Sequence, residues 1–261
     1  MKSSIEVLVA TMNQRDHSLV TKMNIQTDAI IANQSDTNSY ESYFYEGHNI
    51  KYITYQEIGV GLNRNNALMR ATSDYCILAD DDITFLDGYP EKVESMFKKY
   101  KDADILIFNI QNKDKYQIKK AYKVRKINYM KFPTYRIAFR RKKLSYAGIF
   151  FNVNFGGGTD HSCGEDTIFL HDCLKLGLHI YAIPETIARI NEERDSTWFK
   201  GYNKKYFFDR GVLHATLYGK LSRIINLQFL IRHIKLYKSD MSLRKASYYM
   251  TEGSKYRMEI R

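Results

Sequence analysis

The sequence predicts an α/β fold with a mostly parallel central sheet flanked by helices. Short apolar segments alternate with helix-like segments through the first 110 residues, a pattern typical of βαβ units. Polar residues follow directly where several of these segments end, and α/β sheets bind ligands at the carboxyl ends of their strands. The 261-residue chain is 44% hydrophobic. It can therefore bury a sizeable core, in one large domain or in a domain with an appendage.

The elements are expected in a regular order. Strands are predicted over residues 6–12, 28–32, 50–55, 75–79, 104–109 and 178–183. Helices are predicted over residues 17–26, 59–71 after a glycine-rich turn, 90–101 and 165–177, the last with Gly177 as its stop. Residues 111–146 are basic, rich in tyrosine and less regular.

Three consecutive aspartates, Asp80, Asp81 and Asp82, begin where the strand over residues 75–79 ends. Carboxylates this close repel one another and stay ionised only when a cation or hydrogen-bond donors offset the repulsion. A hard divalent ion such as Mg²⁺ or Mn²⁺ suits one or two carboxylates together with substrate phosphates. A solvated turn is the alternative, since Asp is a common turn residue.

Two further groups of polar residues stand at element ends. Polar residues follow the first two strands, and we expect them to converge with the acidic triplet at one edge of the sheet: Thr11, Asn13, Asn33 and Gln34. Glu165 and Asp166 occupy the first turn of a predicted helix, where the positive end of the helix dipole favours carboxylates. Ordinary charge complementarity would also explain that pair.

Together these motifs resemble the GT-A-fold glycosyltransferases of family 2, which are inverting and use nucleotide sugars. The resemblance rests on four motifs in order: residues 13–15 after the first strand, residues 61–67, Asp80-Asp81-Asp82, and Gly164-Glu165-Asp166 before a helix. It covers about residues 5–200. It implies a GT-A-type, Rossmann-like catalytic domain over residues 1–200, followed by a helical, basic extension over residues 201–261.

The resemblance also implies a donor site. Asp80 and Asp82 would hold a divalent cation, Mn²⁺ or Mg²⁺, that carries the donor's diphosphate, with Asp81 also on the donor side. A register shift to Asp80 and Asp81 as the functional pair is the alternative. The remaining donor contacts would come from Thr11, Asn13, Asn33, Gln34, Arg64 and Asn65. The family's usual base-reading acid is replaced here by Asn33-Gln34, although an amide can also pair with a base edge. Further metal or phosphate contacts are expected from Asn191, Glu192 or Ser196.

By the same resemblance, Asp166 is the catalytic base and Glu165 orients the acceptor, with exchanged roles as the alternative. The implied reaction moves a sugar, with inversion, from a nucleotide sugar (a UDP-sugar is expected) to a hydroxyl of a glycan or lipid-linked acceptor. Bacterial surface polysaccharide synthesis is the expected setting. A catalytically inactive GT-A-like protein that binds nucleotide sugars or nucleic acid is the competing interpretation.

The net charge of +11 is unevenly distributed. Residues 201–261 hold 13 Lys and Arg against four Asp and Glu, and they interleave cations with apolar residues at helix-like spacing: Leu221, Ile224, Ile225, Ile231 and Ile234. Such a segment suits an anionic membrane surface, here the inner face of the plasma membrane. Packing on the catalytic domain, or on a second copy in a homodimer, is the alternative.

Other classes of protein fit less well. The three cysteines have no metal-ligand spacing, which indicates a reducing, cytoplasmic setting. The sequence contains no run of 18 apolar residues, so we expect no transmembrane helix. The start of the chain does not have the pattern of a signal peptide. The patterns of haloacid-dehalogenase phosphotransferases and sugar nucleotidyltransferases are missing. No nucleic-acid-binding motif is legible, so we expect no nucleic-acid partner.

Overall fold

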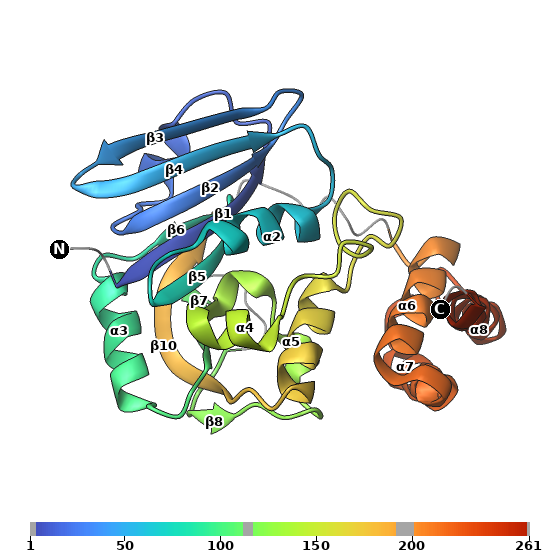
Figure 1. Cartoon of the computed structure of the whole chain (residues 1–261). Coiled ribbons are helices and arrows are strands. Elements are labelled where there is room, and N and C mark those ends of the chain that lie inside the picture. Colours follow the sequence, from blue (N-terminus) through green and yellow to red (C-terminus); the bar gives the residue numbers. More distant parts are fainter. Residues whose placement is uncertain (1–3, 112–116, 192–200, 260–261) are drawn as a thin grey trace. The chain divides into compact units, whose positions relative to one another are not determined.

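A computed structural model describes residues 4–111, 117–191 and 201–259. The chain divides into two compact units: residues 1–159 with 165–194, and residues 160–164 with 195–261. The first unit combines a sheet with helices, and the second is helical (Figure 1). No helix in the described part of the chain is long and apolar enough to cross a membrane.

A single sheet organises the first unit. Its strand order is β3-β4-β2-β1-β5-β9-β7-β10-β6, with β8 paired to β10. The strands are β1 (Ile5–Met12), β2 (Asp28–Gln34), β3 (Ser39–Tyr45), β4 (His48–Tyr55), β5 (Tyr75–Asp80), β6 (Ile83–Phe85), β7 (Ile105–Gln111), β8 (Tyr122–Lys123), β9 (Ile137–Arg140) and β10 (Ile180–Ile190). The neighbours β4, β2, β1 and β5 are all parallel, as are β7 and β10. The predicted α/β fold with a mostly parallel central sheet is confirmed.

Helices cover both faces of this sheet. They are α1 (Ser18–Lys22), α2 (Val60–Arg70), α3 (Tyr89–Lys99), α4 (Arg141–Ala147) and α5 (Glu165–Lys175), with 3₁₀ turns at Tyr129–Lys131 and Thr134–Arg136. Successive strand residues point to opposite faces. Accordingly, Val7 and Val9 of β1 join an apolar cluster with α1 and α3, whereas Leu8 joins a second cluster with α2, α4 and α5. Two cores therefore sandwich the sheet.

The structure differs from the expected elements in several places: β6, β8 and α4 were not expected, and β10 continues to Ile190. Strand β3 was not predicted, because its side chains are mostly exposed and form no apolar run. Strand β9 lies in the stretch expected to be less regular, and it runs antiparallel between β5 and β7. The helix expected over residues 17–26 ends at Lys22, and Asn24 follows in the left-handed region with φ of 54°.

The order of the strands places a binding crevice beside β1. Parallel partners flank β1 on both sides, β2 on one and β5 on the other. The chain thus builds the sheet outward in two directions from β1, which makes the carboxyl ends of β1 and β5 a topological switch point. Open α/β sheets bind their ligands at such points.

Within the described residues, the second unit contains the α-helices α6 (Lys204–Tyr218), α7 (Ser222–Tyr237) and α8 (Leu243–Glu259), with a 3₁₀ turn at Gly219–Leu221. A small core contains buried apolar side chains from all three helices: Phe207, Leu230, Tyr237, Ala246 and Met250. A buried polar pair supplements this core, because His214 Nδ1 lies 2.7 Å from Asn226 Oδ1. Burial lowers the pKa of His214 to about 4, so the ring is neutral at physiological pH.

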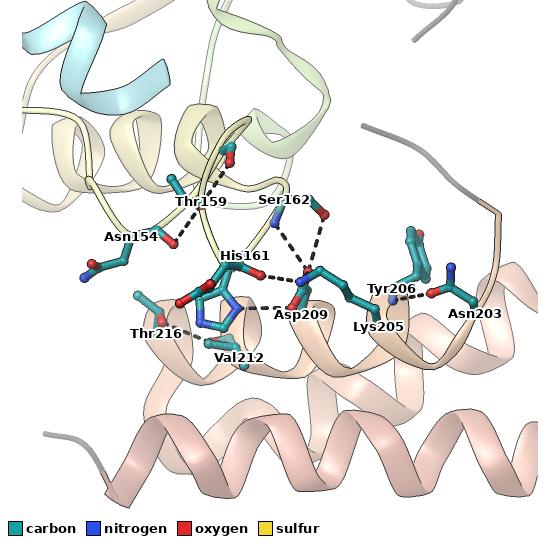
Figure 2. Close-up of polar contacts among 12 residues, drawn as sticks. Asn154, Thr159, His161, Ser162, Asn203, Lys205, Tyr206, Asp209, Val212 and Thr216 are labelled. Carbon is teal, nitrogen blue, oxygen red and sulfur yellow. Dashed lines mark hydrogen bonds and ion pairs between the residues drawn. The ribbon is translucent and has the colours of Figure 1, made fainter. Parts of the chain in front are cut away.

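The short segment 160–164 belongs to the helical unit through Asp209 of α6 (Figure 2). The Asp209 carboxylate accepts hydrogen bonds from His161 Nδ1 at 3.1 Å and from Lys205 Nζ at 2.8 Å. It also accepts bonds from the backbone N–H and the hydroxyl of Ser162, both at 3.3 Å. Burial acts to raise the pKa of Asp209, but these donors outweigh burial and the pKa is lowered. A buried, ionised carboxylate therefore ties this segment to α6.

Candidate active site

The polar residues predicted after β1 and β5 meet at the switch point. The Thr11 hydroxyl donates to Asp81 Oδ2 at 2.6 Å. Gln14 Nε2 lies within 3.0 Å of the Thr11 hydroxyl and 3.4 Å of the same Asp81 oxygen. These contacts hold the middle carboxylate of the acidic triplet against the end of β1. Gln14 belongs to the motif over residues 13–15, but no contact of its own was predicted for it from the sequence.

Asn33 and Gln34, at the end of β2, hold backbone around the crevice. Asn33 accepts from the Gln14 backbone N–H at 3.0 Å and donates to the Gln14 carbonyl at 3.1 Å. Gln34 Nε2 donates to the Gly59 carbonyl at 2.9 Å, next to the start of α2. Between them, Asn13 adopts a left-handed conformation with φ of 55°. The Asn33 amide therefore shapes the loop that carries Asn13, and the Gln34 amide holds the turn before α2.

A cavity of about 540 Å³ opens beside these residues. Its lining includes Asn13, Gln14 and Asn33 from the ends of β1 and β2, with Asp16, Asp36 and Tyr52 around them. Amide, carboxylate and phenol groups thus converge on a concave space, the usual form of a small-molecule site.

Arg64 of α2 links the two acidic motifs. Its Nη2 donates to Asp80 Oδ1 at 2.7 Å, and its Nη1 donates to Glu165 Oε1 at 3.1 Å and to Asp166 Oδ1 at 3.3 Å. Only 6% of its side chain is exposed. Burial acts to lower the pKa of Arg64, and Asp80, Asp166 and Glu165 outweigh burial and raise it. One buried cation therefore binds carboxylates from the end of β5 and from the start of α5.

Asp166 is held by a second donor that the sequence did not reveal. The Thr134 hydroxyl donates to Asp166 Oδ1 at 2.5 Å. Because Arg64 also binds Oδ1, both donors occupy the same oxygen; in the described part of the chain no hydrogen bond is made to Oδ2. The side chain remains 27% exposed. Burial first, and then the negative charge of Glu165, raise the pKa of Asp166 to about 8, while Arg64 and Thr134 oppose the shift.

Two asparagines of α2 have structural contacts. Asn65 exchanges hydrogen bonds with the Phe151 backbone, donating to its carbonyl at 2.9 Å and accepting from its N–H at 2.8 Å. Asn63 donates to the Thr11 carbonyl at 3.0 Å and to the Ala32 carbonyl at 2.8 Å, and so joins the ends of β1 and β2. Donor binding by Asn65 stays a prediction, but its amide already holds the loop after α4.

Close packing around Glu165 explains one of the three consecutive glycines. A Cβ atom on Gly156 would lie 2.5 Å from Val60 Cγ1 and 2.8 Å from the Glu165 carboxyl carbon, and its φ of 102° disfavours other residues. Gly61 is similarly constrained, since a Cβ atom there would lie 2.7 Å from the Asn152 carbonyl oxygen. The loop of glycines 156–158 can therefore lie against the first turn of α5 because Gly156 has no side chain there.

The surroundings of the acidic triplet bear on the expected metal. The described residues contain no group of three or more His, Cys, Asp or Glu side chains suited to hold a metal ion. Mg²⁺ commonly uses only one or two carboxylates together with substrate phosphates, so the donor set of the triplet still fits such an ion. Asn191 lies alongside, because its N–H donates to the Asp82 carbonyl at 2.7 Å. Glu192 and Ser196 lie outside the described residues.

Comparisons with known proteins bear on the family and the fold of the chain. A family profile described as "Glycosyl transferase family 2" matches residues 26–159, just over half of the chain. No curated protein sequence matches the chain.

Among solved structures, residues 1–349 of S. aureus TarS in complex with UDP-GlcNAc match with a TM-score of 0.63 and 15% identity, over 92% of this chain and 74% of that one. The same TarS fragment in complex with UDP matches with a TM-score of 0.60, 15% identity and the same coverage. A structure of S. aureus TarS matches with a TM-score of 0.59 and 15% identity, over 92% of this chain and 45% of that chain. At this identity the likeness concerns the fold, which is that of a GT-A glycosyltransferase. With the profile match, it follows that the chain belongs to glycosyl transferase family 2.

Proposed function

We propose that this glycosyltransferase transfers a sugar, with inversion and with a divalent metal ion, from a UDP-sugar to a hydroxyl group of a glycan or lipid-linked acceptor in surface polysaccharide synthesis. The observation that carries the proposal is the cluster around Arg64. It brings the acidic triplet, which suits the donor diphosphate, next to Asp166, which suits the acceptor hydroxyl. An inverting transfer requires these two groups on opposite sides of one anomeric carbon.

The donor fits the crevice beside β1. The cavity is lined by the exposed amide of Asn13 and by the ring of Tyr52, which suit the hydrogen-bonding edge and the face of a nucleobase. The buried Asn33 amide holds the Gln14 backbone beside them. Solved structures of the same fold with UDP-GlcNAc and with UDP support a uridine nucleotide as donor. The diphosphate would then extend toward the acidic triplet at the end of β5.

Asp80 and Asp82 are the proposed metal ligands, with Mn²⁺ or Mg²⁺ as the ion. The Thr11 hydroxyl already engages Asp81, which favours the outer two carboxylates over the alternative register. Arg64 binds one oxygen of Asp80 and offsets part of the negative charge. When bound, the ion supplies Lewis-acid stabilisation of the charge that develops on the leaving diphosphate.

Asp166 is the proposed base, with Oδ2 as the oxygen that accepts the proton of the acceptor hydroxyl. Thr134 and Arg64 fix Oδ1, so the carboxylate keeps one orientation, and Oδ2 accepts no hydrogen bond from the described residues. Its raised pKa improves its strength as a base near neutral pH, because proton abstraction is most effective when the base pKa lies near the operating pH. Glu165, which also accepts a hydrogen bond from Arg64, is the residue proposed to orient the acceptor.

Three measurements test this proposal. The full chain is incubated with a panel of UDP- and GDP-sugars, glycan acceptors and Mn²⁺; release of the nucleotide is measured, and NMR assigns the anomeric configuration of the product. Asp166→Asn should lower turnover by roughly 10²–10⁴-fold, the usual contribution of a positioned base, while calorimetry shows unchanged donor affinity. If Glu165→Gln instead abolishes turnover and Asp166→Asn does not, the two roles are exchanged. Donor binding without transfer to any acceptor would contradict the proposed activity and leave a binding protein.

A further inference from the structure

Helix α7 turns one side toward the core of the helical unit. Ser222, Asn226, Leu230 and Tyr237 are its buried residues, and Leu230 and Tyr237 belong to the apolar cluster shared with α6 and α8. The separations of four, four and seven residues place these four on one side of a helix. These four residues, with the partly buried Phe229 and Ile234, account for the packing of α7 within its own unit.

The opposite side of α7 carries an exposed apolar row. Ile224, Leu227 and Ile231 are 67%, 55% and 61% exposed, and their separations of three and four residues align them along the helix. Leu221 and Leu236 near the two ends are 61% and 55% exposed. Ile225 and Ile234, which the sequence grouped with this row, are half-buried instead. Single exposed aliphatic residues are ordinary, but a continuous row marks an interaction surface.

Cations border this row on both sides and at both ends. Arg223, Arg232 and Lys235 are exposed on α7, and Lys220 and Lys238 stand just outside its two ends. From Lys220 to Lys238 the sequence contains no Asp or Glu. This side of α7 therefore presents aliphatic side chains that are surrounded by Lys and Arg, with no acidic residue in the same segment. We call this face, residues 220–238 with Ile224, Leu227 and Ile231 at its centre, the α7 face.

The chemistry of the α7 face distinguishes between partners. A nucleic-acid backbone would attract the cations, but it gives no gain for burying aliphatic side chains, and stacking with bases requires aromatic rings. The headgroup layer of an anionic membrane satisfies both features. Aliphatic side chains enter the acyl boundary, while Lys and Arg extend their charged ends to the lipid phosphates.

We propose that the α7 face docks on an anionic lipid surface with the helix axis parallel to that surface. The contact is independent of catalysis, because none of its residues belongs to the active site. It gives the enzyme access to acceptors that are themselves carried on lipid. A second copy of the chain is the other occupant that the apolar row would accept, and the experiment below distinguishes it.

The test is co-sedimentation of the full chain with vesicles of phosphatidylcholine alone or with about one third phosphatidylglycerol. Wild-type protein should bind the anionic vesicles at low salt and lose binding at high salt, since surface charges are screened over about 10 Å at 0.1 M salt. Arg223→Gln/Arg232→Gln/Lys235→Gln should weaken binding by about 100-fold, given the usual contribution of each cation near an anionic surface. Ile224→Gln/Leu227→Gln/Ile231→Gln should abolish binding at unchanged net charge.

A matched control keeps the result specific to the α7 face. Lys119→Gln/Lys120→Gln/Lys142→Gln removes the same charge from exposed positions of the first unit and should leave vesicle binding near wild type. All substituted side chains are exposed, and circular dichroism should show unchanged folding. The proposal is overturned if wild-type protein stays in the supernatant at low salt, or if the control variant loses as much binding as the α7 charge variant. It is equally overturned if wild-type protein is a dimer in solution that the apolar substitutions make monomeric, with no vesicle binding.

Discussion

The two oxygens of Asp166 lie in different surroundings, and this asymmetry defines what the residue can do. Thr134 and Arg64 both donate to Oδ1, at 2.5 and 3.3 Å. Both contacts favour the charged carboxylate and oppose the effects of burial and of Glu165, which raise its pKa. Thr134 is therefore a positioning residue for the proposed base: it fixes the orientation of the carboxylate and limits how far its pKa rises.

Replacing Thr134 should change the pH dependence of turnover. The base acts only when ionised, so activity rises with pH through the pKa of Asp166, which is about 8. Thr134→Val removes a hydrogen bond to the charged form, so the rising limb should move to higher pH by about one unit, the equivalent of one bond to a charged group. Thr134→Ser keeps the hydroxyl and should restore the wild-type profile. If the Thr134→Val variant is active and its turnover rises over the same pH range as that of wild type, the role of Thr134 is contradicted but that of Asp166 is not.

At the level of elements, the helical unit depends on a close contact between α6 and α8. A Cβ atom on Gly211 of α6 would lie 2.1 Å from the Met250 carbonyl oxygen of α8. Reciprocally, a Cβ atom on Gly253 of α8 would lie 2.1 Å from the Phe208 carbonyl oxygen of α6. The Ser254 hydroxyl donates to the Gly211 carbonyl at 3.0 Å across the same contact. Two glycines thus allow the backbones of α6 and α8 to touch, and Arg257 Nε adds a second polar bond by donating to the Thr216 hydroxyl at 3.0 Å.

Gly211→Ala should destabilise the helical unit by about 2 kcal/mol. Alanine favours a helix over glycine by about 1 kcal/mol, but the added methyl group meets backbone atoms that only a shift of the whole helix can relieve. Urea unfolding of the full chain, followed by circular dichroism, measures the change. Gly157→Ala is the matched control, because a Cβ atom there meets no atom within 4 Å. A Gly211→Ala variant as stable as wild type would show that the two helices separate at no cost.

At the scale of the whole chain, opposite charges are divided between segments with different tasks. The proposed donor and acceptor sites use carboxylates gathered around one buried arginine, whereas the α7 face carries cations without acidic residues. Clustered carboxylates destabilise the protein in the absence of ligand, because like charges repel. Binding of a metal ion with a nucleotide should therefore be visible as a change in stability.

UDP together with Mn²⁺ should raise the melting temperature of the protein. At a concentration of 100 times Kd, a ligand that binds only the folded state adds about 2.7 kcal/mol. Thermal unfolding with UDP, Mn²⁺, both, or both with EDTA measures this linkage. Asp80→Ala/Asp82→Ala should lose the increase, whereas Asp74→Ala, at the other end of the same strand region, should keep it. A full increase in the double variant would contradict the assigned metal ligands.

The sequence by itself determined the fold class and the acidic motifs of the site. The continuous apolar runs of β1, β2 and β5 indicate strands that are buried on both faces of a parallel sheet. Such a run is a local feature of the sequence and can be recognised without the tertiary structure. The acidic triplet and the Glu165-Asp166 pair could be located because strand ends and helix starts are also local features. Strand β3 could not be predicted, since an exposed edge strand leaves no apolar run.

Only the tertiary structure decided how these motifs act on one another. The family resemblance implies a donor contact for Arg64, and the structure shows its guanidinium bound to carboxylates of both acidic motifs. Thr134 is 32 residues from Asp166 in the chain, and nothing around it distinguishes it from any other threonine. Likewise, the sequence grouped Ile225 and Ile234 with the exposed row, and only the packing of α7 separates them from Leu227. The reason is physical: periodicity reports burial along one element, whereas hydrogen bonds between distant residues depend on how the elements pack.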